Sequence, residues 1–358
     1  MRTILVIGSA HHNTLGMLRC LGAAGFMVDL VLIGGSKKFL SKSRYVRKLF
    51  ILSNLDKLQE LLDINYNKET EKPIIISCTD AVASFLDIKY EELKSKFHFF
   101  NSGIAGRLTA YMDKESQVEL AKEVGIQVPQ SYVYRSTISN TIFPCLLKPL
   151  QSSKGGKQII ICKNKEELIE GLSSFEKSID VLVQQYIEKE YEIVILGLSV
   201  NGNITIPGYI FKHRDFDGGT LYSTVKPIDS LSENIVDRCK DMIHKMNYEG
   251  LFGIELIYSK KHYYFIEVNL RNDATTYALA MAGVNLPELY IKAKTENYQI
   301  SDTLSVKEIN SIVEFNDFKH RKDFGVSIFR WLKDFFSASC KYYFNWHDPM
   351  PFFYAPFK

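Results

Sequence analysis

The amino-acid sequence predicts an α/β protein whose N-terminal part is a doubly wound parallel sheet. A short β-branched apolar run at 4–7 ends at Gly8 and is typical of a buried parallel strand. A helical spacing of leucines at 15–21 follows, and apolar runs at 28–33 and 74–76 predict two more strands. Strands that alternate with helices in this order are typical of a parallel sheet with helices on both faces.

Length and composition restrict the class of protein further. At about 150 residues per domain, 358 residues predict two or three domains. The chain carries 44 Lys and Arg against 41 Asp and Glu, which argues against a nucleic-acid groove or a polybasic membrane patch. Six scattered cysteines without a C-x-x-C pair argue against a disulfide framework or a zinc site. Because no secretory signal and no run of about 18 apolar residues is visible, we expect a cytoplasmic protein.

We expect four parts along the chain. An N-terminal Rossmann-like domain at 1–112 is followed by α+β subdomains at 113–188 and 189–305 and by an aromatic extension at 306–358. The dinucleotide fingerprint G-x-G-x-x-G is absent after Gly8, so a nicotinamide cofactor is not expected. The aromatic side chains of the extension are expected to pack against the body: Trp331, Phe335, Phe336, Phe344, Trp346 and Phe352.

The strongest chemical signal is a predicted hairpin between the runs 252–258 and 263–269. A turn centred on Lys261 would place Glu255 directly opposite Glu267, with Asn269 on the same face. The opposite face would then be apolar and carry Ile254, Leu256, Ile266 and Val268. Paired carboxylates repel at a cost of up to about 1 kcal/mol, and no Lys or Arg is interleaved on their face. A hard cation such as Mg²⁺ would offset this repulsion, and the alternative is a solvated face with coincidental charges.

Two further segments carry groups suited to phosphate. Arg271 follows Asn269 by two residues, and the geometry of its guanidinium suits the oxygens of a phosphoryl group. The alternative is an ordinary surface arginine. Lys148 lies on a predicted strand before the Ser-, Gly- and Lys-rich loop 151–158, whose backbone N–H groups could approach phosphate oxygens. The loop is not a P-loop, because Gln151 stands where that motif needs glycine. A plain mobile turn is the alternative.

Taken in order, these segments resemble the ATP-grasp superfamily over roughly residues 1 to 300. The run 267–271, Glu-Val-Asn-Leu-Arg, is similar to the E-[IV]-N-x-R signature of the family and is the most specific element. The carboxylate–amine ligase branch is the most similar, and it includes D-aspartate ligases and the formate-using glycinamide ribonucleotide transformylase. The resemblance implies an ATP-grasp fold, in which the two α+β subdomains clasp ATP.

The resemblance also implies a role for each matching residue. The nucleotide phosphates would contact Lys114 and Lys148, and a loop closing over them would contain Ser153, Lys154, Gly155, Gly156, Lys157 and Gln158. Adenine would bind at Gln184, Gln185, Tyr186 and Ile187, and the ribose at Glu192, with Glu190 as the alternative. Two Mg²⁺ ions, or Mn²⁺ in their place, would bind Glu255, Glu267 and Asn269, and Arg271 would be the catalytic residue. Gln184 departs from the Glu that is common in the family, which weakens the expected selectivity for adenine.

The activity implied is that of an ATP-dependent ligase, which joins a small-molecule carboxylate to an amine through an acyl phosphate and releases ADP and phosphate. Two alternatives stay open, an ATP-grasp phosphotransferase acting on a non-carboxylate acceptor and a non-catalytic ATP-binding protein. No nucleic-acid partner and no membrane insertion are expected, and a homodimer is compatible with the sequence.

Candidate substrate contacts come from three places. His11 and Asn13 follow the first strand at its carboxyl end, where open α/β sheets bind ligands, although Asn13 could instead cap a helix. His213 and Arg214 lie in a predicted polar loop and could meet an acidic substrate group, or the loop could be plain surface. Asp273 could orient the incoming amine.

Overall fold

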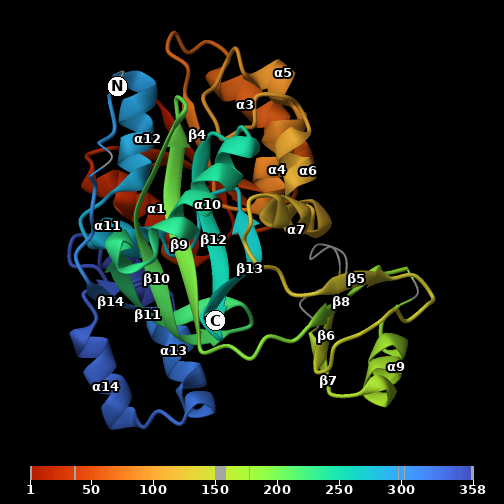
Figure 1. The fold of residues 1–358 in the computed structure, drawn as a ribbon. Coiled ribbons are helices and arrows are strands. Elements are labelled where there is room, and N and C mark those ends of the chain that lie inside the picture. The colour runs from red at the N-terminus through yellow and green to blue at the C-terminus, as the bar shows by residue number, and fades with distance from the viewer. Residues whose placement is uncertain are drawn as a thin grey trace.

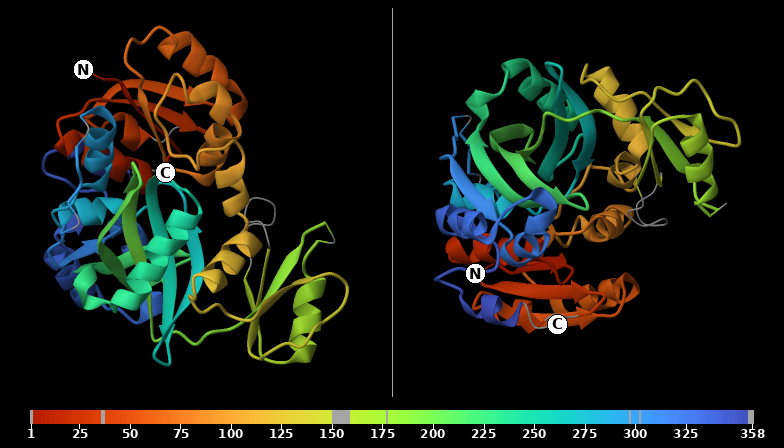
Figure 2. Two further views of the ribbon diagram at one scale, coloured as in Figure 1. Left: turned by 45° about the horizontal axis from the view of Figure 1, so that its top comes forward. Right: turned by 90° about the horizontal axis from the view of Figure 1, so that it is seen from below.

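The computed structural model describes residues 2–35, 38–149, 159–176, 178–296, 298–301 and 303–355. These residues form a four-stranded N-terminal sheet, a small four-stranded sheet and a large seven-stranded sheet (Figure 1). The views in Figure 2 show the small sheet standing apart from the other two. Within the described residues, no helix has the length and apolar character needed to cross a bilayer.

The N-terminal sheet is parallel throughout, with strand order β3-β2-β1-β4, which confirms the predicted doubly wound arrangement. Its strands are β1 (Ile4–Gly8), β2 (Val28–Ile33), β3 (Val46–Leu52) and β4 (Ile74–Ser77). Its helices are α1 (His12–Ala23), α2 (Lys38–Ser41), η1 (Leu55–Lys57), α3 (Leu58–Tyr66), α4 (Asp80–Ile88), α5 (Tyr90–Leu93) and α6 (Arg107–Tyr111). In β1, Ile4 and Val6 enter one apolar cluster and Leu5 and Ile7 another, because both faces of the sheet are covered.

At the carboxyl edge of this sheet, β1 and β4 pass directly into helices. Thr79 caps α4, because its side chain accepts a hydrogen bond from the Val82 N–H. The cap of α1 is His11, whose ring nitrogen accepts from the Asn13 N–H. The alternative that Asn13 caps this helix is therefore wrong.

The small sheet is antiparallel, with strand order β5-β8-β6-β7. Its strands are β5 (Ser131–Tyr134), β6 (Cys145–Pro149), β7 (Ile160–Cys162) and β8 (Val181–Gln185). Helix α9 (Lys165–Ser173) packs on it through a core that includes Leu147, Leu168 and Val183. Helix α7 (Lys114–Glu123) packs on the large sheet, where the Gln117 amide exchanges hydrogen bonds of 3.0 and 3.1 Å with the Val268 backbone.

The large sheet has strand order β13-β12-β9-β10-β11-β14-β15 and is antiparallel except between its last two strands. Its strands are β9 (Tyr191–Val200), β10 (Asn203–Phe216), β11 (Gly219–Pro227), β12 (Gly250–Ser259), β13 (His262–Asn269), β14 (Ile309–Ile312) and β15 (Cys340–Lys341). Associated helices are η2 (Ile228–Ser230), α10 (Glu233–Lys245), α11 (Thr276–Met281) and α12 (Leu286–Thr295). The segment predicted as a loop around His213 and Arg214 is instead part of β10, and the turn is only Asp217 and Gly218.

The C-terminal extension adds α13 (Glu314–His320), η3 (Arg321–Phe324), α14 (Ile328–Ser337) and α15 (Met350–Tyr354). It is anchored to α1 by the buried Arg19, which donates to the carbonyls of Tyr342, Tyr343 and Asp348 at 2.7, 2.7 and 2.9 Å. Trp331 is buried, as expected. Phe336 and Trp346 are 76% and 82% exposed, so the expected packing of the aromatic side chains holds only in part.

Candidate functional site

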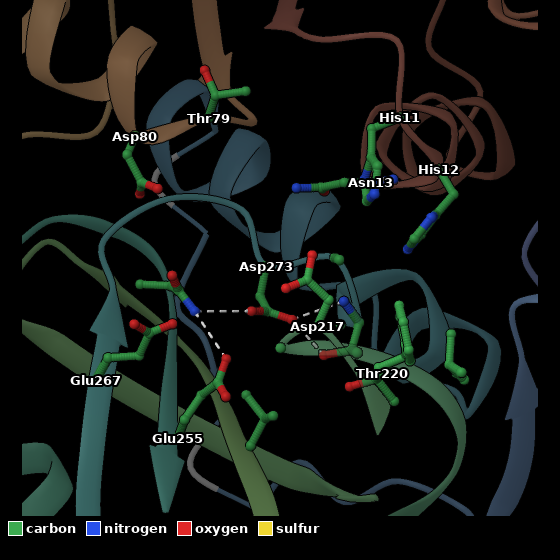
Figure 3. A pocket seen from close by; sticks show the side chains of 18 of the residues that line it. His11, His12, Asn13, Thr79, Asp80, Asp217, Thr220, Glu255, Glu267 and Asp273 are labelled. Carbon is green, nitrogen blue, oxygen red and sulfur yellow. Dashed lines mark hydrogen bonds between the residues drawn. The ribbon is translucent and has the colours of Figure 1, made fainter. Parts of the chain in front are cut away.

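A cavity of about 650 Å³ lies where the N-terminal sheet, the small sheet and the large sheet meet (Figure 3). The carboxyl ends of β1 and β4 contribute one wall, and the β12–β13 hairpin contributes the opposite one. The predicted residues that line it are His11, Asn13, Lys114, Lys148, Glu255, Glu267, Asn269, Arg271 and Asp273. Residues far apart in the sequence therefore converge on one site.

Glu255 and Glu267 are directly paired across the hairpin, as predicted, and both project into the cavity (Figure 3). The reason for their register differs from the expectation. The turn consists of Lys260 and Lys261, both with positive φ, and a bulge between Glu255 and Leu256 shifts the register before the carboxylates are reached. The bulge leaves Ile266 only partly buried and puts Phe265 in the core, so the predicted core position of Ile266 is wrong.

A lysine that sequence reasoning missed lies beside this carboxylate pair. The Lys212 ammonium, on β10, is 2.8 Å from the Glu255 carboxylate and also pairs with Glu192. Although burial opposes the effect, these two carboxylates raise the pKa of Lys212. No Lys or Arg is interleaved on the hairpin face itself, and the cation beside it comes from β10, which is separated from β12 by β9.

Glu255 lies in surroundings with an excess of negative charge. Burial raises the pKa of the Glu255 carboxyl to about 8, Lys212 opposes the rise, and Glu267 and Asp273 add to it. A bound cation would remove this excess. Two carboxylates and an amide are the hard oxygen donors that Mg²⁺ prefers, so Glu255, Glu267 and Asn269 fit this ion by their chemistry.

The amide of Asn269 is engaged on both sides. Its Nδ2 donates to Glu255 at 3.4 Å and to Asp273 at 3.3 Å, and its Oδ1 accepts from Arg271 at 3.0 Å. A half-turn of the amide would bring Oδ1 toward the carboxylates, as a cation ligand requires. Among the described residues, no three His, Cys, Asp or Glu side chains are already grouped as a metal site.

Arg271 is held by a partner from the N-terminal sheet. Its Nε donates to Asp80 Oδ1 at 2.8 Å and its Nη2 to Oδ2 at 3.4 Å, and Nη1 donates to the Asn272 carbonyl at 3.0 Å. Asp80 is the first residue of α4 and lines the same cavity. Its ion pair thus joins the N-terminal sheet to the end of the hairpin.

The two predicted phosphate-binding lysines face the cavity together. Lys148 donates to the Gln184 side-chain oxygen at 3.0 Å. Burial lowers the pKa of Lys148 to about 8, Lys114 lowers it further, and Glu267 opposes the change. The expected closing loop, Ser153, Lys154, Gly155, Gly156, Lys157 and Gln158, lies outside the described residues.

The segment expected to hold adenine and ribose flanks the cavity without lining it. Gln184, Gln185, Tyr186, Ile187 and Glu192 are all absent from the cavity wall in the described part of the chain. The Tyr186 N–H donates to the Pro144 carbonyl at 2.9 Å, and Glu192 is ion-paired with Lys189 and Lys212. The alternative ribose ligand, Glu190, accepts from the Lys260 N–H at 2.7 Å.

Two of the candidate substrate residues are held away from the cavity. Arg214 is buried and pairs with Asp317 at 2.8 Å and with Asp334 at 2.7 Å. The ring of His213 shares a 2.7 Å hydrogen bond with Thr224. The expectation that His213 and Arg214 meet an acidic substrate group is therefore corrected, because Arg214 anchors the C-terminal extension instead.

His11, Asn13 and Asp273 do reach the cavity, and each already has a local partner. Asn13 donates to the Cys78 and Asn272 carbonyls at 3.1 and 3.2 Å, which connects the ends of β1, β4 and β13. Asp273 accepts from the Thr275 N–H at 2.8 Å.

Sequence reasoning missed the aromatic and histidine side chains that the tip of β10 and the C-terminal extension contribute to the cavity. Phe216 at the tip of β10 stacks on His320 of α13, with ring centroids 3.6 Å apart, and both line the cavity with Tyr342. No local pattern could identify them, since only tertiary packing brings these segments to the site.

Comparisons with known proteins find one domain family and several relatives. Residues 111–276 match the ATP-grasp domain family. The formate-dependent phosphoribosylglycinamide formyltransferase of Bacillus subtilis is 28% identical over 248 residues, which cover 63% of this chain and 61% of that protein. The D-alanine–D-alanine ligase of Fusobacterium nucleatum is 28% identical over 204 residues, which cover 54% of this chain and 65% of that protein. The chain thus matches less than two thirds of the length of either relative.

Solved structures share the fold. An N5-carboxyaminoimidazole synthetase from Staphylococcus aureus complexed with ADP superimposes with a TM-score of 0.69 at 13% identity, over 91% of this chain and 87% of that one. A biotin carboxylase domain from Hydrogenobacter thermophilus in complex with MgADP superimposes with a TM-score of 0.64 at 17% identity. The superposition covers 87% of this chain and 73% of that one. The chain has the ATP-grasp fold, and residues 111–276 match the model of the ATP-grasp domain family.

Proposed function

We propose that the protein is an ATP-dependent ligase that joins a carboxylate to an amine and releases ADP and phosphate. One observation carries the proposal. Glu255 and Glu267 face each other across a hairpin in the cavity that also holds Lys148 and Arg271. Paired carboxylates beside two cationic side chains suit the binding of a metal–nucleotide phosphate.

The curated relatives support the same class of reaction. One is named for its dependence on formate, and the other is named as a ligase of D-alanine, so both names refer to a carboxylate substrate. We also propose the division at residues 112, 188 and 305, with 113–188 closing over the nucleotide.

Each residue of the site has a role in this proposal. Lys114 and Lys148 would bind the nucleotide phosphates, with help from the loop 153–158. Glu255, Glu267 and Asn269 would hold Mg²⁺, which would supply positive charge beside the nucleotide phosphates. Adenine would lie along 184–187, and the ribose hydroxyls would be reached by Glu192 if it released one of its two lysines.

The reaction balances in two steps. A carboxylate oxygen attacks the γ-phosphorus, the bond to the β,γ-bridging oxygen breaks, and ADP leaves. The amine nitrogen then attacks the acyl carbon, the bond from that carbon to the phosphate oxygen breaks, and the nitrogen loses a proton as phosphate leaves. Arg271 would orient the phosphoryl oxygens in both steps, since its guanidinium matches their geometry.

ADP release in the presence of ATP, Mg²⁺ and pools of carboxylates and amines tests the proposal. We expect release that requires one member of each pool. ADP release with an alcohol alone, accompanied by a phosphorylated alcohol, would indicate a phosphotransferase. Tight ATP binding without turnover in any pool would indicate a non-catalytic ATP-binding protein.

A further inference from the structure

Helix α14 carries an apolar stripe that faces away from the body of the protein. Ile328, Phe329, Leu332 and Phe336 are all exposed, and Phe329 is 80% exposed. At 100° per residue these four side chains fall within about 100° of the helix circumference. On the other side of the helix, Trp331 is buried in the apolar cluster of the extension.

The stripe continues beyond the helix. Phe324, at the end of η3, is also exposed, and we call the five residues Phe324, Ile328, Phe329, Leu332 and Phe336 the α14 patch. Figure 1 shows α14 projecting at the edge of the molecule, on the side opposite the N-terminal sheet. Soluble surfaces rarely leave so many large apolar side chains together unless they contact something.

The surroundings of the patch are cationic. Between residues 318 and 337 the chain carries Lys319, Arg321, Lys322, Arg330 and Lys333, against only Asp323 and Asp334. Asp334 is buried against Arg214 and also pairs with Arg330 at 3.3 Å, and Asp323 pairs with His320 at 3.0 Å. Exposed positive charge therefore borders the apolar stripe, although the charge of the whole chain is nearly balanced.

We propose that the α14 patch binds the surface of an anionic lipid bilayer, with α14 lying in the plane of the interface. An amphipathic helix with aromatic and aliphatic residues on one side and Lys or Arg beside them is suited to this position. A second copy of the chain fits less well, because a two-fold contact through the patch would bring the two cationic borders together. The binding is peripheral, does not depend on the proposed ligase reaction, and would hold the enzyme near a membrane.

Co-sedimentation of the full chain with vesicles tests this inference. We expect binding to vesicles that contain equal amounts of phosphatidylcholine and phosphatidylglycerol, and at least about tenfold weaker binding to phosphatidylcholine alone. Phe329→Ser with Phe336→Ser should abolish binding, whereas Ile64→Ser, at an exposed apolar position on α3, should not change it. Lys333→Glu should weaken binding, and Lys68→Glu, also exposed but distant in the sequence, should have little effect. High salt should release the protein.

Three results would overturn the proposal. The first is the absence of sedimentation with anionic vesicles, and the second is unchanged sedimentation of the double Phe variant. The third is a concentration-dependent dimer, detected by light scattering, that the double variant converts to a monomer, since the patch would then be a contact between copies of the chain.

Discussion

The ammonium group of Lys212 lies 2.8 Å from the Glu255 carboxylate, beside the carboxylate pair of the β12–β13 hairpin. The Lys212 side chain is 1% exposed and contacts Glu192 on its other side. The single positive charge of Lys212 therefore neutralises only part of the negative charge of Glu192 and Glu255. The Glu267 carboxylate faces the cavity and does not contact this lysine. The remaining negative charge is what a bound cation would neutralise.

Lys212→Met tests this compensation. Removing one partner of a buried ion pair leaves an unpaired buried charge, so we expect the free energy of unfolding to fall by about 3–5 kcal/mol. Urea denaturation measures the change. Lys189→Met is the matched control, because Lys189 also contacts Glu192 but is half-exposed, and its loss should cost less than about 1 kcal/mol. Equal effects of the two substitutions would contradict the assigned role of Lys212.

Glu267→Gln tests the metal assignment. The substitution keeps the shape of the side chain and removes a charged ligand, so we expect turnover to fall by about a hundredfold or more and the Mg²⁺ concentration for half-maximal activity to rise. Glu166→Gln, on the exposed surface of α9, should leave both quantities unchanged. Full activity of Glu267→Gln, with unfolding behaviour unchanged, would remove Glu267 from the metal site.

The lowered pKa of Lys148 predicts how ATP binding depends on pH. Burial and Lys114 lower this pKa to about 8, so the free protein carries the Lys148 charge below about pH 8 and loses it above. The affinity for ATP should then fall by up to about tenfold per pH unit above that value, as calorimetry can measure.

Lys148→Arg is the control for this pH dependence. Because a guanidinium stays charged through this range, the variant should retain ATP binding and lose the decline attributed to Lys148. Lys148→Ala should bind ATP weakly at every pH. If the affinity of Lys148→Arg for ATP fell as steeply with pH as that of the unchanged protein, the pH dependence would belong to another group.

Asp80→Asn tests whether the ion pair with Arg271 matters for the reaction. Arg271 would lose its anionic partner and its fixed orientation, so we expect kcat to fall by about tenfold with little change in the KM for ATP. Asp80→Glu keeps the charge and should recover most of the loss. Asp80 is thus a positioning residue in this hypothesis, and an unchanged kcat in Asp80→Asn would reject it.

Local patterns predicted much of the hairpin, and long-range contacts account for the rest of the site. Alternating side chains in 252–269 indicate the pairing of Glu255 with Glu267, because both strands are adjacent in the sequence. The bulge left no such signal and was not predicted, and its omission cancelled the error in the centre of the turn, so the pairing of the two carboxylates was still correct. Strand β3 was missed because Arg47 and Lys48 interrupt its apolar pattern.

Arg214 shows why charged residues mislead when only the sequence is read. Its neighbourhood is polar and precedes a Gly-Gly pair, which favours a loop, yet β10 continues through it. Its partners Asp317 and Asp334 are more than a hundred residues away, so the buried ion pairs could not be anticipated. Lys212 and Asp80 were missed as partners for the same reason.

The hydrogen bonds from Arg19 to residues 342–348 have a consequence for biosynthesis. A guanidinium that is 2% exposed in the finished protein has its hydrogen-bond partners more than three hundred positions downstream. While the chain is still emerging from the ribosome, the Arg19 guanidinium has none of these partners and is hydrogen-bonded to water. The side of α1 that carries it is then not yet covered by the C-terminal extension. This contact can form only after residues 342–348 have been translated, so a nascent-chain stall before that point would leave this side of α1 accessible to proteases and chaperones.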